Sequence, residues 1–336
     1  MSFIDNILCA PINGGFSMDD YWVWCGSAIP GEDGKYHLFS ARWPKKYPFF
    51  LGYIHYSEIV RAESATPEGP YEFREVVLGD IGEEHWDGRM THNPTIRKCG
   101  DDYVLFYIGG TFKGEKPAAS QLRKGKVPET DICYNSIRIG AAISKSVLGP
   151  WKRPDKPILE PRAGKWDSRV VTNPAPCILE NGKIYLYYRS NTPEGLRIGL
   201  AAADNINSPF IRVHDDPVIQ FENGGYVEDP FVWHNGRCFE MIAKDWTGLI
   251  TGEKNAGMHA RSGDGISWTL ADPVKAYSRT VKWDNGATTV QGHFERPQLI
   301  LENGIPTHLL AATMDGHAEY FDDATRSWNM VIPLKK

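Results

Sequence analysis

Charged and polar side chains precede four prolines of the sequence at matching positions. The residues directly before these prolines are Asn93, Asn173, Asp229 and Arg296. The residues one position earlier are His92, Thr172, Glu228 and Glu295. Carboxyl groups that crowd together repel one another and lose water, so one can keep its proton while another stays ionised. Such a pair can protonate a leaving group and supply a base or nucleophile, which is the chemistry of glycoside hydrolysis.

A fifth copy of this pattern lacks the proline. In the segment FSMDDYWVWCGSAIPGEDGKYHLFSAR, Asp20 aligns best with the residue before the proline, and Asp19 with the residue one position earlier. The alignment therefore predicts that Asp20 joins Glu228, Asp229 and Glu295 at one end of a central channel.

A purely structural explanation of the pattern also exists. Aspartate and asparagine before a proline often cap the turn at the start of a strand. We favour that explanation for Asp229 and Asn93, and a functional role for Glu228 and Asp20.

The elements that would position these residues repeat along the chain. Five β-like runs lead through a tight turn to an aromatic residue, namely Tyr71, Trp151, Phe210, Trp268 and Trp328. The successive intervals are 80, 59, 58 and 60 residues. This spacing predicts five copies of a unit of roughly sixty residues.

Each unit contains two hairpins. Apolar runs such as PAPCILENGKIYLYYRS are broken by Asn-Gly or Asp-Gly turns, which is typical of antiparallel β-hairpins. Two hairpins per unit predict an all-β fold, a five-bladed β-propeller with four antiparallel strands per blade. We expect residues 1–336 to form a single domain, with blades at approximately 18–78, 90–160, 170–220, 226–275 and 293–334.

The long first interval is explained by an insertion. The polar stretch KGEKPAASQLRKGKVPET, residues Lys113 to Thr130, falls between the second and third strands of the second blade. In a blade whose first strand starts at the channel mouth, that connection returns to the same mouth. The insertion should therefore overhang the channel, or else form a solvated loop without function.

Composition excludes several classes of partner. The formal net charge of −5 gives no reason to expect nucleic acid or an anionic membrane. The six cysteines form no CxxC pair, which favours reduced thiols in the core.

The start of the chain lacks the pattern of a secretory signal, so we expect a cytoplasmic protein, or an exported one whose signal is absent from this sequence. The oligomeric state is left open.

The chain resembles the five-bladed glycosidases of glycoside hydrolase family 43, the arabinanases and β-xylosidases, and of the related family 32. The motifs DGKYHLF, ENGKIYLYY, SKSVLGPWKR and YVEDPFVW carry the resemblance. It implies that Asp20 matches the first-blade base or nucleophile and that Glu228 matches the general acid. The third carboxylate of those families falls on Asn173, which departs from their pattern.

The resemblance also suggests a metal site, and the positions of polar residues in the repeated units suggest the substrate contacts. QGHFERP is similar to a fifth-blade Gly-His motif, so His293 is a candidate ligand for a structural calcium in the channel; no cofactor is expected to be required. The predicted substrate-binding residues are Asp19, Arg42, His92, Asn93, Asn173, Arg189, Asp229, Glu295 and Arg296.

These observations together predict an exo-acting glycosidase that removes a terminal sugar from a plant or algal oligosaccharide. Two alternatives stay open. A carbohydrate-binding propeller without catalysis is favoured by Asn173, and a glycosyl-transferring relative is suggested by family 32.

Overall fold

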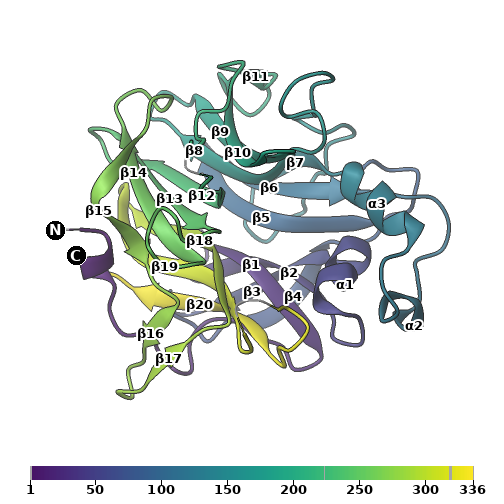
Figure 1. Ribbon diagram of the computed structural model, residues 1–336, viewed down its shortest axis with the longest axis horizontal. Helices are drawn as coiled ribbons and strands as arrows, with labels where there is room; N and C mark the ends of the chain where they lie inside the picture. The colour runs from purple at the N-terminus through teal and green to yellow at the C-terminus, as the bar shows by residue number, and fades with distance from the viewer. Residues whose placement is uncertain (1, 223, 318–319, 336) are drawn as a thin grey trace.

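Five antiparallel sheets stand around a common centre in the computed structural model, which describes residues 2–222, 224–317 and 320–335 (Figure 1). The arrangement is a five-bladed β-propeller, as predicted. The first strand of each blade lies innermost and neighbours the first strands of the adjacent blades. Ile96 N, for example, donates to Ser27 Oγ at 3.2 Å, which joins the first two blades.

The strands follow the chain from blade to blade. Blade one contains β1 (Tyr21–Pro30), β2 (Tyr36–Pro44), β3 (Glu58–Ser64) and β4 (Glu72–Leu78). Blade two contains β5 (Met90–Cys99), β6 (Asp102–Gly110) and β7 (Arg138–Ser144). Blade three contains β8 (Thr172–Ile178), β9 (Ile184–Thr192), β10 (Gly195–Ala203) and β11 (Ile211–Arg212). Blade four contains β12 (Val227–His234), β13 (Phe239–Asp245), β14 (Ala256–Ser262) and β15 (Thr269–Tyr277). Blade five contains β18 (His293–Glu302), β19 (Ile305–Met314) and β20 (Ser327–Pro333).

Shorter elements connect the blades. A ribbon of β16 (Thr280–Lys282) and β17 (Thr288–Val290) separates blades four and five. The helical segments are η1 (Ile4–Asn6), α1 (Phe49–Tyr56), α2 (Ala119–Leu122) and α3 (Pro128–Asn135). None of the described helices is long and apolar enough to cross a membrane.

The expectation of four strands in every blade is wrong for blades two and five, which have three each among the described residues. After β7 the described chain returns to this strand only in two isolated bridges, between Ile143 and Lys152 and between Ile139 and Leu159. Pro150 and Pro154 lie on either side of Lys152. A proline has no N–H to donate to a neighbouring strand.

The N-terminal segment occupies the outer edge of blade five instead. Phe16 and Asn329 exchange two backbone hydrogen bonds of 2.9 Å, and Leu8 N donates to the carbonyl of Pro333 at 3.0 Å. The two ends of the chain are thereby joined in one sheet.

All five innermost strands share one irregularity near their start. The pairing of each first strand with the second is interrupted at two successive residues, and the first of the two has a positive φ. We call these first residues the bulge residues: Cys25 (φ 57°), Asn93 (52°), Asn173 (53°), Asp229 (57°) and Arg296 (53°).

Two Trp-Asp dipeptides brace the approaches to β5 and β8. The ring of Trp86 stacks on Tyr107 at 5.9 Å, and the Tyr107 hydroxyl donates to Asp87 at 2.6 Å. Trp166 and Asp167 make the same contacts with Tyr188, at 5.9 and 2.8 Å. The repeated motif is therefore a structural brace.

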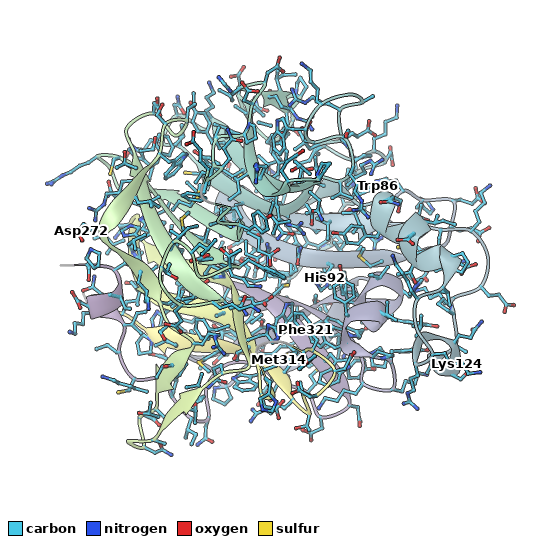
Figure 2. The ribbon with its side chains drawn as sticks, viewed as in Figure 1. Trp86, His92, Lys124, Asp272, Met314 and Phe321 are labelled. Atoms are coloured by element: carbon cyan, nitrogen blue, oxygen red, sulfur yellow. The ribbon has the colours of Figure 1, made fainter. Side chains whose placement is uncertain are left out.

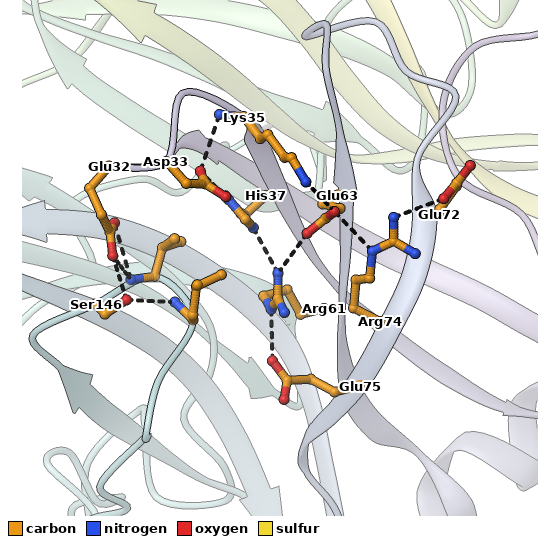
Figure 3. A network of polar contacts seen from close by, with 12 residues as sticks. Glu32, Asp33, Lys35, His37, Arg61, Glu63, Glu72, Arg74, Glu75 and Ser146 are labelled. Carbon is orange, nitrogen blue, oxygen red and sulfur yellow. Dashed lines mark hydrogen bonds and ion pairs between the residues drawn. The ribbon is translucent and has the colours of Figure 1, made fainter.

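A network of charges ties the outer part of blade one together. Figure 3 shows the buried Arg61 between His37 and Glu75, with Nε 2.8 Å from the Glu75 carboxylate. In the same view Glu32, from the β1–β2 turn, accepts hydrogen bonds from Ser146 Oγ and from the backbone N of Val147 in blade two. These contacts link the two blades at the surface.

Candidate active site

A cavity of about 410 Å³ lies where the innermost strands begin, and we call it the central cavity. Every blade contributes to its wall. The polar side chains of the wall are Cys25, His92, Asn93, Thr172, Asn173, Arg189, Asn191, Glu228, Asp229, Lys244, Glu295 and Arg296. Figure 2 shows His92 near the centre of the view, with Phe321 just below it.

The bulge residues form a chain of hydrogen bonds from blade to blade. Cys25 Sγ donates to Asn93 Oδ1 at 2.9 Å, and Asn93 Nδ2 donates to Asn173 Oδ1 at 2.9 Å. Asn173 Nδ2 donates in turn to Asp229 Oδ1, which also accepts from Arg296 at 3.1 Å. The five side chains thus fix one another at the base of the cavity.

The structure corrects the alignment of the first blade. Cys25 has the bulge geometry that was assigned to Asp20, and Trp24 takes the place assigned to Asp19. Asp19 and Asp20 are exposed in the turn before β1 and do not line the cavity. The error arose because Gly26 replaces the proline that marks the bulge in the other blades.

Arg42 also lies away from the cavity. Its Nε donates a hydrogen bond to Glu58 at 2.9 Å. Its guanidinium group lies between the rings of Tyr21 and Phe73, with Cζ 4.2 and 4.4 Å from the two ring centres. Successive residues of a strand point to opposite faces of the sheet, so it is the neighbouring Trp43 that lines the cavity.

The other predicted residues do come together. One oxygen each of Glu228, Asp229 and Glu295 can be chosen so that all three lie within 4.8 Å of one another. The ammonium of Lys244 lies between two of them, 3.0 Å from Glu228 and 2.5 Å from Glu295. Arg189 Nε lies 3.6 Å from the other oxygen of Glu228.

The carboxylates of this group have opposite pKa shifts. Burial and the negative charge of Glu228 raise the pKa of Asp229 to about 6, against the opposing effect of Arg296. Burial also acts to raise the pKa of Glu295, but the charge of Lys244 and the hydrogen bond from His293 outweigh it and lower that pKa to about 2. At neutral pH Glu295 is therefore firmly ionised.

Cys25 and His92 are uncharged at neutral pH. Burial raises the pKa of the Cys25 thiol well above its ordinary value. Burial and the nearby Arg296 lower the pKa of His92 to about 3. His92 Nδ1 lies 2.8 Å from Ser57 Oγ, and its ring stacks on Tyr53 at 4.7 Å.

The side chains do not fit the calcium site that the sequence suggested. Calcium prefers six to eight oxygen ligands, whereas the ammonium of Lys244 already bridges Glu228 and Glu295. His293 does not line the cavity; its Nδ1 lies 2.8 Å from Glu295, and its ring stacks on Phe321 at 4.0 Å. We therefore assign no chemistry to a metal.

Aromatic side chains form a roof over the cavity. Phe49, Phe50 and Tyr53 come from α1, Tyr134 comes from α3, and Phe321 follows β19. The insertion of blade two thus reaches the cavity through Tyr134, just beyond the stretch in which the sequence placed it. In Figure 1 the three α-helices lie on the right of the view, with α1 beside β2 and α3 near the end of β6.

Cys25 and the roof were not predicted from the sequence, although the sequence carries a signal for Cys25. In every blade a glycine with positive φ turns the chain between the first and second strands, at Gly34, Gly100, Gly182, Gly236 and Gly304. The bulge residue lies seven to nine positions before this glycine in each blade, whereas Asp20 lies fourteen positions before Gly34.

Comparison with known proteins supports the resemblance at the level of fold. No protein-family model and no curated protein matches the sequence. A family 117 glycoside hydrolase from the marine bacterium Zobellia galactanivorans has a TM-score of 0.67 at 16% identity, over 98% of this chain and 89% of that one. An exo-1,5-α-L-arabinanase from a bovine ruminal metagenomic library has a TM-score of 0.59 at 13% identity, over 94% of both chains. An α-L-arabinofuranosidase from Lactobacillus brevis has a TM-score of 0.59 at 11% identity, over 99% of this chain and 94% of that one.

Proposed function

We propose that this protein is a glycoside hydrolase whose two catalytic carboxylates are Glu228 and Glu295. The observation that carries the proposal is their placement in one cavity, on either side of the Lys244 ammonium. Glu228 is the more exposed of the two, with 14% of its side chain accessible against 8% for Glu295. Glu228 is therefore the general acid, as its position in the VEDP motif suggests.

Glu295 takes the role that the sequence had assigned to Asp20. Its pKa of about 2 keeps it ionised, which suits a nucleophile that attacks the anomeric carbon. Glu228 donates its proton to the departing glycosidic oxygen and afterwards accepts a proton from the water that releases the sugar. One oxygen of Glu228 lies within 4.8 Å of one oxygen of Glu295, and we propose a retaining mechanism because retaining enzymes have the more closely spaced pair of carboxyl groups.

Asp229 replaces the third carboxylate of the resembling families, which is Asn173 here. Asp229 is the buried neighbour of Glu228 in the chain, and burial and the negative charge of Glu228 raise the pKa of Asp229 to about 6. Asn173 donates a hydrogen bond to Asp229 and fixes its orientation.

The size and closure of the cavity support exo action on the end of an oligosaccharide. Its volume of about 410 Å³ suits one or two sugar units, and the roof of Phe49, Phe50, Tyr53, Tyr134 and Phe321 restricts passage of a longer chain. The fold neighbours include an exo-arabinanase and an arabinofuranosidase, which makes pentose-containing plant saccharides the first substrates to test.

The test is hydrolysis of 4-nitrophenyl glycosides and of arabino- and galacto-oligosaccharides by the wild type and by single variants. We expect Glu228→Gln and Glu295→Gln each to reduce kcat/KM by about 100-fold or more, because each removes one half of the carboxylate pair. Asp20→Asn is the matched control and should keep full activity, because Asp20 is exposed outside the cavity. Unchanged hydrolysis in both glutamate variants would refute the assignment.

A carbohydrate-binding protein without catalysis is the second candidate. It is favoured by the bulge residues Cys25 and Asn173, which stand where the resembling families have carboxylates. Tight saccharide binding by the wild type with no product after long incubation would support this function.

A further inference from the structure

A second cavity, of about 500 Å³, lies beside the central one, and we call it the side cavity. Two segments that are far apart in sequence form its walls. One is the connection from β2 into α1, which includes Lys45, Lys46 and Tyr47, and the other is the turn after α2, which includes Arg123 and Lys124. Arg123 donates to the carbonyl of Lys46 at 3.0 Å, so the two walls are tied together.

The side cavity is strongly basic. Four cationic side chains line it, Lys45, Lys46, Arg123 and Lys124, against the single carboxylate of Asp322. None of the four has a carboxylate within ion-pair distance among the described residues. This differs from the central cavity, where Lys244 bridges two carboxylates. Figure 2 shows Lys124 at the edge of the molecule, where an incoming ligand can reach it.

Aromatic rings complete the wall and orient the cations. The ammonium of Lys45 lies 5.4 Å from the Trp22 ring centre, and that of Lys46 lies 5.1 Å from the Tyr47 ring centre. An aromatic face packs well on the C–H face of a sugar ring, while ammonium and guanidinium groups bind carboxylate or sulfate oxygens. A neutral saccharide would use only the rings, whereas an acidic one uses both kinds of contact.

The two cavities adjoin each other. Phe49 and Phe50, at the start of α1, line both of them. Phe49 also packs edge-on against Trp22 at 5.5 Å and stacks on Phe321 at 5.2 Å, so one aromatic ridge joins the walls of both cavities. The part of a saccharide that leaves the central cavity beside the exposed ring of Phe50 is therefore close to the side cavity.

We propose that the side cavity binds an anionic unit, bearing a carboxylate or a sulfate ester, of the saccharide whose terminal sugar enters the central cavity. The substrate class is then an acidic oligosaccharide. This inference rests on the proposed function for the placement of the terminal sugar only, because the charge and shape of the side cavity do not depend on turnover.

The test compares the binding of three hexasaccharides of equal length by calorimetry, with chromatography of the ligand as a check for turnover. Hexagalacturonate provides the carboxylate, a carrageenan hexasaccharide provides the sulfate, and arabinohexaose is neutral. The variant is Lys46→Gln/Arg123→Gln/Lys124→Gln. The matched control is Lys152→Gln/Lys156→Gln/Arg237→Gln, which removes three exposed cations that line neither cavity.

We expect at least one acidic ligand to bind the wild type about tenfold more tightly than arabinohexaose, and the side-cavity variant to lose about tenfold of that affinity. The control variant should lose less than about twofold in affinity, and added salt should weaken the binding of the acidic ligand only.

Preference for the carboxylate or the sulfate ligand identifies the anionic group. Equal affinity for neutral and acidic ligands, an equal loss in both variants, or tighter binding of a uridine hexanucleotide than of any saccharide would overturn the proposal. Acidic binding without hydrolysis would contradict only the proposed enzyme activity.

Discussion

At the scale of single residues, the site depends on buried carboxylates whose pKa values shift in opposite directions. Asp229 accepts side-chain hydrogen bonds from the Asn173 amide and the Arg296 guanidinium, and its pKa rises to about 6. Glu295 lies against the ammonium of Lys244, and its pKa falls to about 2. At Asp229 burial and the charge of Glu228 outweigh Arg296, whereas at Glu295 Lys244 and His293 outweigh burial.

The raised pKa of Asp229 predicts a measurable cost to stability. Between about pH 4 and pH 6 the folded state holds a proton on Asp229 that the unfolded state has released, so its contribution to stability falls as pH rises through this range. The total is up to about 3 kcal/mol, from 1.36 kcal/mol per unit of pKa. Urea unfolding at a series of pH values should show Asp229→Asn becoming steadily more stable relative to the wild type from pH 4 to pH 6.

The comparison between variant and wild type isolates Asp229 from other groups. His92, whose pKa is lowered to about 3, contributes stability that increases with pH in the same range and is present in both proteins. Asp322→Asn, at an exposed carboxylate, serves as the control. A free-energy difference between Asp229→Asn and the wild type that stays constant with pH would contradict the raised pKa.

At the scale of elements, the roof of the central cavity depends on contacts between α1 and α3. His55 Nε2 lies 2.9 Å from Thr130 Oγ1, and both residues are buried. The second ring nitrogen of His55, Nδ1, has no hydrogen-bond partner within the described part of the chain. Cys133 Sγ donates to the carbonyl of Ile54 at 3.1 Å, which is a second link between the two helices. These contacts join a helix of blade one to the insertion of blade two.

Removal of the Thr130 hydroxyl tests the role of this contact. Thr130→Val leaves both nitrogens of a buried imidazole without a partner, and we expect a loss of about 1–3 kcal/mol in the free energy of unfolding. Because the roof lines the cavity, KM should rise more than kcat falls. Thr288→Val, at an exposed threonine of β17, should change neither quantity. Equal stability of the two variants would show that the contact does not hold the helices together.

At the scale of the whole molecule, the ring of blades is closed by the N-terminal segment. Phe16 is 2% exposed and packs in a cluster with Tyr71 of blade one and Val331 of blade five. Asn329, opposite Phe16, accepts from Gly26 N and donates to Ser40 Oγ, both at 2.7 Å. Closure therefore combines strand pairing, apolar packing and side-chain hydrogen bonds.

Phe16→Ala should weaken this closure strongly. Truncation of a buried phenylalanine costs about 3–5 kcal/mol, and here the lost contacts also join the first blade to the last. Leu8→Ala is the matched control, because Leu8 lies on the same segment but is 40% exposed. Thermal unfolding should show a much larger fall in Tm for Phe16→Ala than for Leu8→Ala, and similar falls would contradict the closure described.

Much of the fold could be predicted from local signals. Asn-Gly and Asp-Gly turns identify hairpins, and the aromatic repeat identifies the number of blades. Four of the five bulge residues were found because a proline follows each of them. Cys25 was missed because glycine follows it instead of proline. The nearby exposed residues Asp19 and Asp20 were aligned with the bulge position in its place. The roof was missed because helix α1, with the sequence FFLGYIHY, is apolar on all sides and has no helical periodicity to distinguish it from a strand.

The bulge residues also bear on how such a scaffold diversifies. Their φ angles differ by only 5°, yet they comprise a thiol, two amides, a carboxylate and a guanidinium. The main chain at these places is thus insensitive to the chemistry of the side chain that it presents. Natural variation or a directed library can therefore exchange these functional groups within the same main-chain geometry where each new side chain finds a hydrogen-bond partner among its neighbours.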